Sequence, residues 1–167
     1  QESRGLGDVY KRQNYNSNYK YNQNSEIMRE IRYRGIGIAE RKWVFGSLWF
    51  DTRDGVTLIW SEELKYWVRV DPATVGQYTG LKDEHGKEIY EGDVIRSPLS
   101  EDKTRPHRIF YHTGNAAFMG ALVDRKELCY LRLDQDWIYK FGKEVIGNIH
   151  DNPELIEKQT AERHKTN

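Results

Sequence analysis

Polar side chains that could take part in catalysis are densest between residues 76 and 93, where carboxylates, lysines, tyrosines and one imidazole follow one another closely. Within this segment His85 lies near Asp83 and Glu88, so a histidine base assisted by a carboxylate would give a small hydrolase or nuclease. Asp83 and Gly86 are also the residue types that a tight hairpin turn requires. The pattern specifies no nucleophile beside the histidine. We therefore expect these side chains to shape a turn, and keep the hydrolase or nuclease as the alternative.

The histidines do not show the spacing of a metal site; they stand at positions 85, 107, 112, 150 and 164. His107 and His112 would point to opposite faces of one strand, because side chains alternate along a strand. The single cysteine, Cys129, excludes a multi-cysteine zinc site. We therefore expect no metal ligands and no cofactor, and keep a His/Asp zinc site assembled by the fold as the alternative.

Basic and aromatic residues gather in a second segment, around Arg32, Arg34 and Trp43. The two arginines alternate with Ile31 and Tyr33, which predicts that both arginines lie on the outer side of a strand. Such a surface can stack the bases of single-stranded nucleic acid beside cations, and exposed Trp and Arg are equally typical of protein interfaces. The plainer interpretation is a solvated strand face with Trp43 in the core.

The charge balance limits the partners. Lys and Arg total 26, Asp and Glu total 26, and the formal net charge is zero, so the chain as a whole does not attract phosphates or anionic membranes. No apolar run approaches ~18 residues, so we expect no membrane-spanning helix. The residues that we expect to contribute to binding a protein or nucleic acid come from the two segments above: Gln77, Tyr78, Lys82, Asp83, His85 and Tyr90 in the first, and Arg32, Arg34 and Trp43 in the second.

Short strands separated by turn residues must position these side chains. The alternation over residues 29–35 predicts a half-buried strand, and residues 42–50 and 56–60 predict a hairpin joined by an Asp-Gly turn. Gly46 inside the first of those strands predicts a bulge or a close packing point. Eight to ten such strands over about 120 residues, with little helix, indicate a small antiparallel barrel or roll. Residues 134–142 fit either a strand end or a short helix.

The two ends of the chain have different compositions from its middle. Residues 14–24 contain no aliphatic side chain, which is typical of disorder, and residues 8–13 read like a translated sequencing adapter. We therefore expect residues 1–27 to be a disordered or artefactual extension, residues 28–158 to form one β domain, and residues 159–167 to fray. Near the end of the domain, Asn152-Pro153-Glu154 predicts a short C-terminal helix.

Four segments resemble the YopX family of bacteriophage and prophage proteins: residues 29–35, 43–46, 74–94 and 144–155. The third is the most specific, since it reads TVGQYTGLKDEHGKEIYEGDV without interruption. The resemblance implies a mainly β fold with a small SH3-like barrel or roll, and an origin in a phage or prophage that acts in the bacterial host cytoplasm. It implies no particular catalytic residue.

From these observations we expect a phage or prophage accessory protein that is a non-enzymatic binding module. Its partner would be a host or phage protein, or nucleic acid, and edge strands of a small β-roll could also pair two copies of the chain.

Overall fold

Almost all regular structure in this computed structural model is β-strand. The structure describes residues 30–98, 106–123 and 130–156. Within these ranges the strands are β1 (Tyr33–Ile36), β2 (Trp43–Phe50), β3 (Thr57–Ser61), β4 (Trp67–Arg69), β5 (Gly76–Lys82), β6 (Glu88–Tyr90), β7 (Asp93–Arg96), β8 (His107–His112), β9 (Ala117–Leu122), β10 (Tyr130–Arg132) and β11 (Glu144–Asn148). One α-helix, α1 (Gln135–Lys140), and short 3-10 turns at Pro72–Thr74 and Thr113–Asn115 accompany them. The predicted mainly β fold is confirmed.

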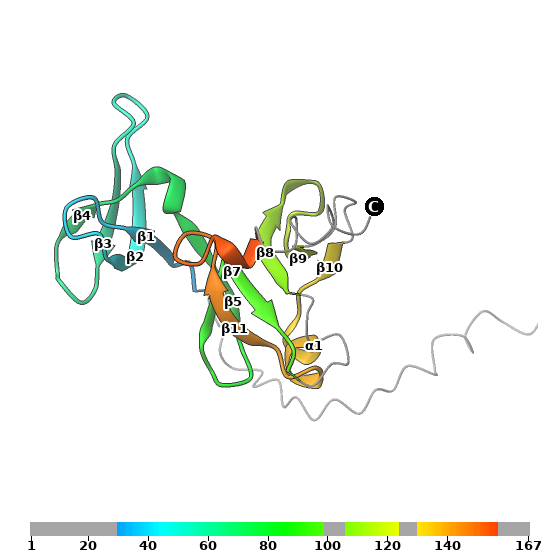
Figure 1. Cartoon of the computed structure of the whole chain (residues 1–167). Coiled ribbons are helices and arrows are strands. Elements are labelled where there is room, and N and C mark those ends of the chain that lie inside the picture. Colours follow the sequence, from blue (N-terminus) through cyan, green and yellow to red (C-terminus); the bar gives the residue numbers. More distant parts are fainter. Residues whose placement is uncertain (1–29, 99–105, 124–129, 157–167) are drawn as a thin grey trace, which may run out of the picture.

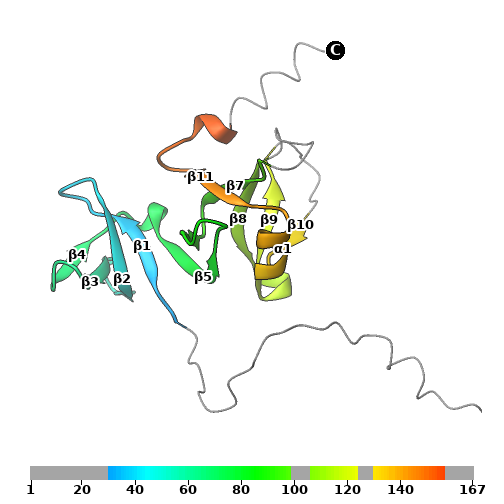
Figure 2. The same cartoon turned by 90° about the horizontal axis from the view of Figure 1, so that it is seen from below.

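The strands form two sheets rather than one barrel. One has the order β4-β3-β2-β1-β5-β6 and the other β10-β9-β8-β7-β11, and every pairing within them is antiparallel. Over the described residues neither sheet closes on itself, so the predicted antiparallel barrel or roll takes the form of two open sheets. Figures 1 and 2 show β1–β4 at one end of the molecule and β7–β11 at the other.

The β1–β4 end is a local meander. The Asp51–Gly55 turn closes the predicted β2–β3 hairpin, with the Asp51 N–H donating to the Val56 carbonyl over 2.9 Å. The buried cluster of this end is formed by Val44, Ile59, Val68 and Val70. All four residues come from one stretch of the chain, residues 44–70.

Gly46 marks a close packing point within β2, as predicted. Its φ is +151°, and a Cβ added there would lie 1.8 Å from the Trp60 carbonyl oxygen on β3. No side chain fits in that space, so the paired backbones of β2 and β3 require glycine at this position.

Strand β5 joins the two ends of the molecule (Figures 1 and 2). Its start pairs with β1, where Gln77 lies opposite Tyr33. Its remainder pairs with β6, where Lys82 lies opposite Glu88 across the predicted 83–86 hairpin turn. The Asp83 N–H donates to the Lys87 carbonyl over 2.8 Å, which confirms the turn. One continuous strand therefore belongs to both halves of the fold.

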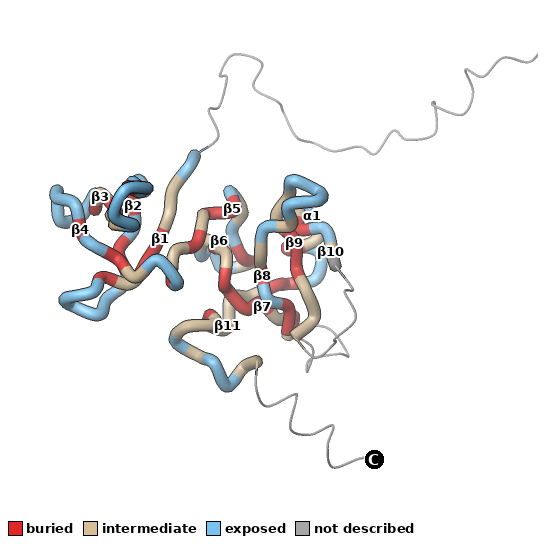
Figure 3. The backbone as a smooth tube through the Cα atoms, turned by 90° about the horizontal axis from the view of Figure 1, so that it is seen from above, coloured by how far each residue is buried: buried red, intermediate tan, exposed pale blue. Residues whose placement is uncertain are grey.

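The other end has a core gathered from distant segments. Ile89, Ile95, Ile109, Leu133 and Ile138 form its buried cluster, and Figure 3 shows buried backbone along β7 and part of β5. Within residues 134–142, which are ambiguous in sequence, Gln135–Lys140 form helix α1, and the side chain of its N-cap Asp134 accepts the Trp137 N–H over 2.8 Å. This helix adds Ile138 to the core.

The structure describes only some of the residues on which the predictions for the chain ends were made. Residues 154–156 are helical, as predicted, with the Leu155 N–H donating to the Asn152 carbonyl over 3.0 Å. The expectations for residues 1–27 and 159–167, and the positions of Cys129 and His164, lie outside the described residues. Among the described helices, none has the length and apolar content needed to cross a bilayer.

Candidate functional site

Arg34 is buried where β1 meets the start of β7, between the two ends of the molecule, a place that we call the junction. Its side chain is 9% exposed, its Nη2 lies 2.6 Å from Asp93 Oδ1, and it also donates to the Glu91 carbonyl over 3.1 Å. The prediction that Arg34 lies on an outer face is therefore wrong, and Ile31, expected inside, is 61% exposed. The reason is that the arginine side of β1 packs against the start of β7, where a buried carboxylate neutralises the charge.

Aromatic rings complete the environment of Arg34. Its guanidinium carbon lies 4.7 Å from the ring centroid of Trp43 and 5.0 Å from that of Tyr90. The Trp43 indole N–H donates to Asp151 Oδ2 over 2.7 Å, which ties β2 to the turn after β11. A cation between two rings and a carboxylate is a stabilising arrangement in a partly dry environment. These residues hold the two ends of the molecule together.

Arg32 and Tyr90 share a second polar contact at the junction. Arg32 pairs with Glu88, whose other oxygen accepts the Tyr90 hydroxyl over 2.9 Å. Burial, and then the bond to Glu88, raise the pKa of Tyr90 far above its usual value. Burial likewise raises the pKa of Tyr78, over whose ring the Arg32 guanidinium lies at 5.3 Å. Both tyrosines therefore stay protonated and act as packing residues.

Asp93 shapes the corner that follows β6. It is 1% exposed, and its Oδ2 accepts the Tyr90 N–H over 2.8 Å, so its carboxylate caps neighbouring backbone. Removal from water raises the pKa of Asp93, while the Arg34 charge opposes the rise. The carboxylate is thus fully occupied inside the protein.

Asp83 is equally committed to backbone. It is 1% exposed; its Oδ1 accepts the N–H groups of His85 and Lys87 over 2.9 and 2.8 Å, and its Oδ2 accepts the Val145 N–H over 3.1 Å. The pairing of His85 with Asp83 or Glu88, on which the hydrolase alternative depends, does not form, because Glu88 binds Arg32. Turn chemistry accounts for Asp83, as expected.

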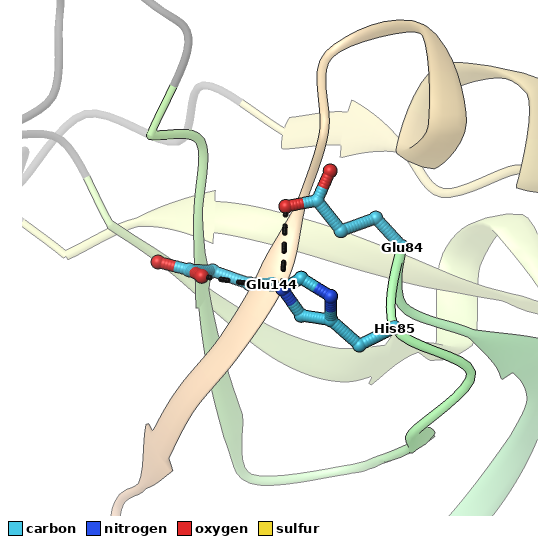
Figure 4. Close-up of side chains that lie close together, drawn as sticks. All are labelled: Glu84, His85 and Glu144. Atoms are coloured by element: carbon cyan, nitrogen blue, oxygen red, sulfur yellow. Dashed lines mark ion pairs between the residues drawn. The ribbon is translucent and has the colours of Figure 1, made fainter.

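The His85 ring instead meets two other glutamates (Figure 4). Its Nε2 lies 3.5 Å from Glu84 Oε1 and 3.7 Å from Glu144 Oε2. Donor atoms of the three side chains all lie within 4.8 Å of one another, and this is the group of described residues that could hold a metal ion. Sequence reasoning missed it because Glu144 is far from the hairpin along the chain.

The residues predicted for binding divide by exposure. Lys82 and His85 are exposed; Arg32, Trp43 and Gln77 are half-buried; and Arg34, Tyr78, Asp83 and Tyr90 are buried. The backbone of Lys82 also holds helix α1, because its N–H and carbonyl both bond the Gln135 amide over 3.1 and 2.7 Å. A binding role for the exposed and half-buried residues stays a prediction.

An exposed aromatic face lies on the β2–β4 strands and was not anticipated. We name Trp49, Leu58, Trp60 and Trp67 the tryptophan face. Trp49 pairs with Leu58 and Trp60 with Trp67 across the strands, so the four side chains share one side of the sheet. Trp49 and Trp67 are 44% and 46% exposed, and the rings of Trp60 and Trp67 lie 5.6 Å apart.

A hollow of about 390 Å³ lies between the start of β2 and the β3–β4 turn. Its lining mixes charges of both signs: Arg32 and Lys42 on one hand, and Glu40, Glu62 and Glu63 on the other. The mixture gives no preference for a polyanionic ligand.

Comparison with known proteins assigns the chain to a family. A family model described as YopX protein matches residues 6–157, so the chain belongs to the YopX family, as the sequence segments had indicated. Among solved structures, the chain is similar to protein EF1440 from Enterococcus faecalis, with 26% identity and a TM-score of 0.51. That similarity covers 76% of this chain and 98% of the other. No curated protein matches.

Proposed function

We propose that this YopX-family chain is a non-enzymatic binding module and that its tryptophan face holds a partner protein. The observation that supports the proposal is the half-exposed aromatic pair Trp49 and Trp67, presented on paired strands together with Leu58 and Trp60. Following the family resemblance, we assign the partner to a phage or its bacterial host, and the site of action to the host cytoplasm.

Aromatic side chains in this arrangement favour association. Burying apolar surface is worth about 25 cal/mol per Å², so covering the exposed parts of two indoles would stabilise a complex substantially. Trp is among the residues that most often dominate protein interfaces. The strand pairing already fixes the backbone beneath these rings, so little conformational freedom would be lost on binding.

The surrounding charges favour a protein over nucleic acid. The turns next to the tryptophan face carry Asp54, Glu62, Glu63 and Lys65, and Arg69 lies opposite Leu58 on the same side of the sheet, so both signs of charge border the face. The nearby Arg53 guanidinium is paired with Asp51 over 2.7 Å. A nucleic-acid surface requires a continuous positive stripe, whereas a mixed polar border around aromatic residues is typical of protein interfaces.

The junction residues do not offer a comparable surface. Arg34, Asp83 and Asp93 use their charges inside the fold, and the carboxylates beside His85 are those of Glu84 and Glu144 rather than that of Asp83. The hydrolase or nuclease remains the alternative, and it predicts that a His85→Gln variant loses a measurable turnover.

Capture from infected host lysate, followed by measurement with the purified partner, tests the proposal. The full chain and a Trp49→Ser/Trp67→Ser variant serve as baits, and Tyr139→Ser is the matched control, because Tyr139 is a 54% exposed aromatic residue on α1. We expect one purified partner to bind the wild type and the control equally, and the double variant at least about tenfold more weakly.

Three results would contradict the proposal. Equal affinity of the double variant would remove the tryptophan face as the binding surface. Salt-sensitive retention on a single-stranded DNA column that the double variant loses would make nucleic acid the partner. A concentration-dependent dimer that only the double variant fails to form would make the partner a second copy of this chain.

A further inference from the structure

We propose that Glu84, His85 and Glu144 form a binding site for one divalent zinc-like metal ion, with a coordination position left open to solvent. This departs from the expectation of no metal, which rested on spacing along the chain. It does not depend on the proposed function, because the site lies on the β5–β6 turn and the start of β11 (Figure 4), whereas the tryptophan face lies on β2–β4.

The separations between the donor atoms fit an ion. Four-coordinate zinc with bonds of about 2.0–2.2 Å keeps its ligand atoms roughly 3.3–3.6 Å apart. His85 Nε2 lies 3.5 Å from Glu84 Oε1 and 3.7 Å from Glu144 Oε2. Direct charge-assisted hydrogen bonds would be shorter, about 2.7–2.9 Å. The two separations from the imidazole are therefore close to ligand-to-ligand spacing, and the donor atoms of the two glutamates lie within 4.8 Å of each other.

The chemistry of the three side chains selects the ion. Two carboxylates and one neutral imidazole give two negative charges, which a divalent cation balances. A mixed nitrogen and oxygen set suits first-row metals such as zinc. Arg96 offsets the acidic charge only in part, since its Nη2 lies 3.5 Å from the other oxygen of Glu144.

The backbone beneath the ligands is already fixed. Buried Asp83 holds the turn and β11 together, since its two oxygens accept N–H groups from His85 and from Val145. The Glu84 N–H donates to the Lys143 carbonyl over 3.0 Å. Each ligand thus follows or adjoins a residue that is bonded across the two segments, which limits the ordering needed on binding.

The ligands are also reachable. The Glu84 and Glu144 side chains are each 25% exposed and that of His85 is 67% exposed. An ion can enter from solvent without any movement of the fold, and water completes its coordination.

Calorimetric titration of the tag-free full chain with Zn²⁺, after removal of metal by chelator, tests the site. We expect one ion per chain. The His85→Gln variant should lose at least about 100-fold in affinity, because removing a ligand costs more than removing a group that orients one. Glu63→Gln, which removes an exposed carboxylate in the β3–β4 turn outside the site, is the control and should bind as the wild type does.

Two further variants sharpen the test. Arg96→Gln should tighten Zn²⁺ binding about threefold, because it removes a competing cation beside Glu144. Trp49→Ser/Trp67→Ser should bind Zn²⁺ normally, which separates this site from the proposed protein interface. If wild type and His85→Gln bind Zn²⁺ alike, the binding is adventitious and the proposal is overturned. Absence of Zn²⁺ binding below millimolar concentration in the wild type would overturn it as well.

Discussion

The β1–β4 end and the β7–β11 end of the molecule build their cores in different ways. Val44, Ile59 and Val68 come from three successive strands of one meander, and the other side of that sheet carries half-exposed tryptophans. Ile89 and Ile138, at the opposite end, come from β6 and from helix α1, far apart along the chain, and neither is exposed. The difference suggests a division of labour, in which one end supplies stability from long-range contacts and the other offers aromatic surface.

Breaking the junction should have the largest effect on stability. We expect Arg34→Met to lower the free energy of unfolding by about 3–5 kcal/mol, because it leaves the buried Asp93 carboxylate without its partner. Urea denaturation followed by tryptophan fluorescence measures this loss. An Arg34→Met/Asp93→Asn variant should recover part of it, since the uncompensated charge is removed. A single variant that unfolds at the wild-type midpoint would show that the pair does not hold the two ends together.

Shortening a side chain in the core of the β7–β11 end should have the next largest effect on stability. Ile109 is fully buried on β8, so Ile109→Ala should cost about 3 kcal/mol through lost burial and the cavity left behind. The same denaturation experiment tests it, with Ile38→Ala as control, because Ile38 is 47% exposed. A similar loss for both variants would contradict the contrast between covered and open apolar residues.

Substitution on the tryptophan face should barely change stability. Trp67→Ser removes a side chain that is 46% exposed, and we expect the free energy of unfolding to change by less than about 1 kcal/mol. Its effect should be on partner binding instead, which is the reverse of the Ile109→Ala result. A Trp67→Ser variant that unfolds as readily as Ile109→Ala would show that the face is part of the core.

The smallest effect that we predict is a pH dependence centred on His150. Burial, followed by the Arg34 charge, lowers the pKa of His150, while Asp151 opposes this shift. The unfolded chain, with an ordinary histidine pKa of about 6.5, then binds more protons than the folded chain between the two pKa values. Stability should therefore decline as pH falls from about 6.5 through the folded pKa.

Comparing wild type with His150→Gln at pH 7.5 and 5.5 isolates this contribution. The raised pKa of Asp93 works in the opposite sense, since its contribution is lost as pH rises through its folded value. Asp93 is present in both proteins, so the difference between them reports His150. An unchanged pH slope in His150→Gln would contradict the assignment.

Local patterns predicted the elements well because their causes are local. Asp83 and Gly86 define a hairpin from the turn conformation alone, and Gly46 indicated a close approach of two strands. Which side of each strand is covered depends on tertiary packing, and the alternation of polar and apolar residues does not reveal it. Arg34 alternates as an exposed residue would, yet its charge is matched by Asp93 from a distant corner.

The same limit explains the missed sites. Trp49 and Trp67 look like core residues in the sequence, and nothing local shows that their side of the sheet is left open. Glu144 meets His85 only because β11 is bonded to the Asp83 turn. The His85 contact depends on hydrogen bonds between distant segments, and the open side of the β2–β4 sheet depends on where the rest of the chain packs; only the three-dimensional structure gives either.

The lack of room for a side chain at position 46 has a consequence for comparing distant YopX sequences. Because the Trp60 carbonyl oxygen occupies the place where any Cβ would lie, residue 46 can serve as a fixed reference point when such sequences are aligned. An alignment displaced by a single residue here would exchange the two sides of β2 and assign the indole of Trp49 to the interior. Other family members can therefore be searched for the same outward aromatic pattern by counting from this one glycine.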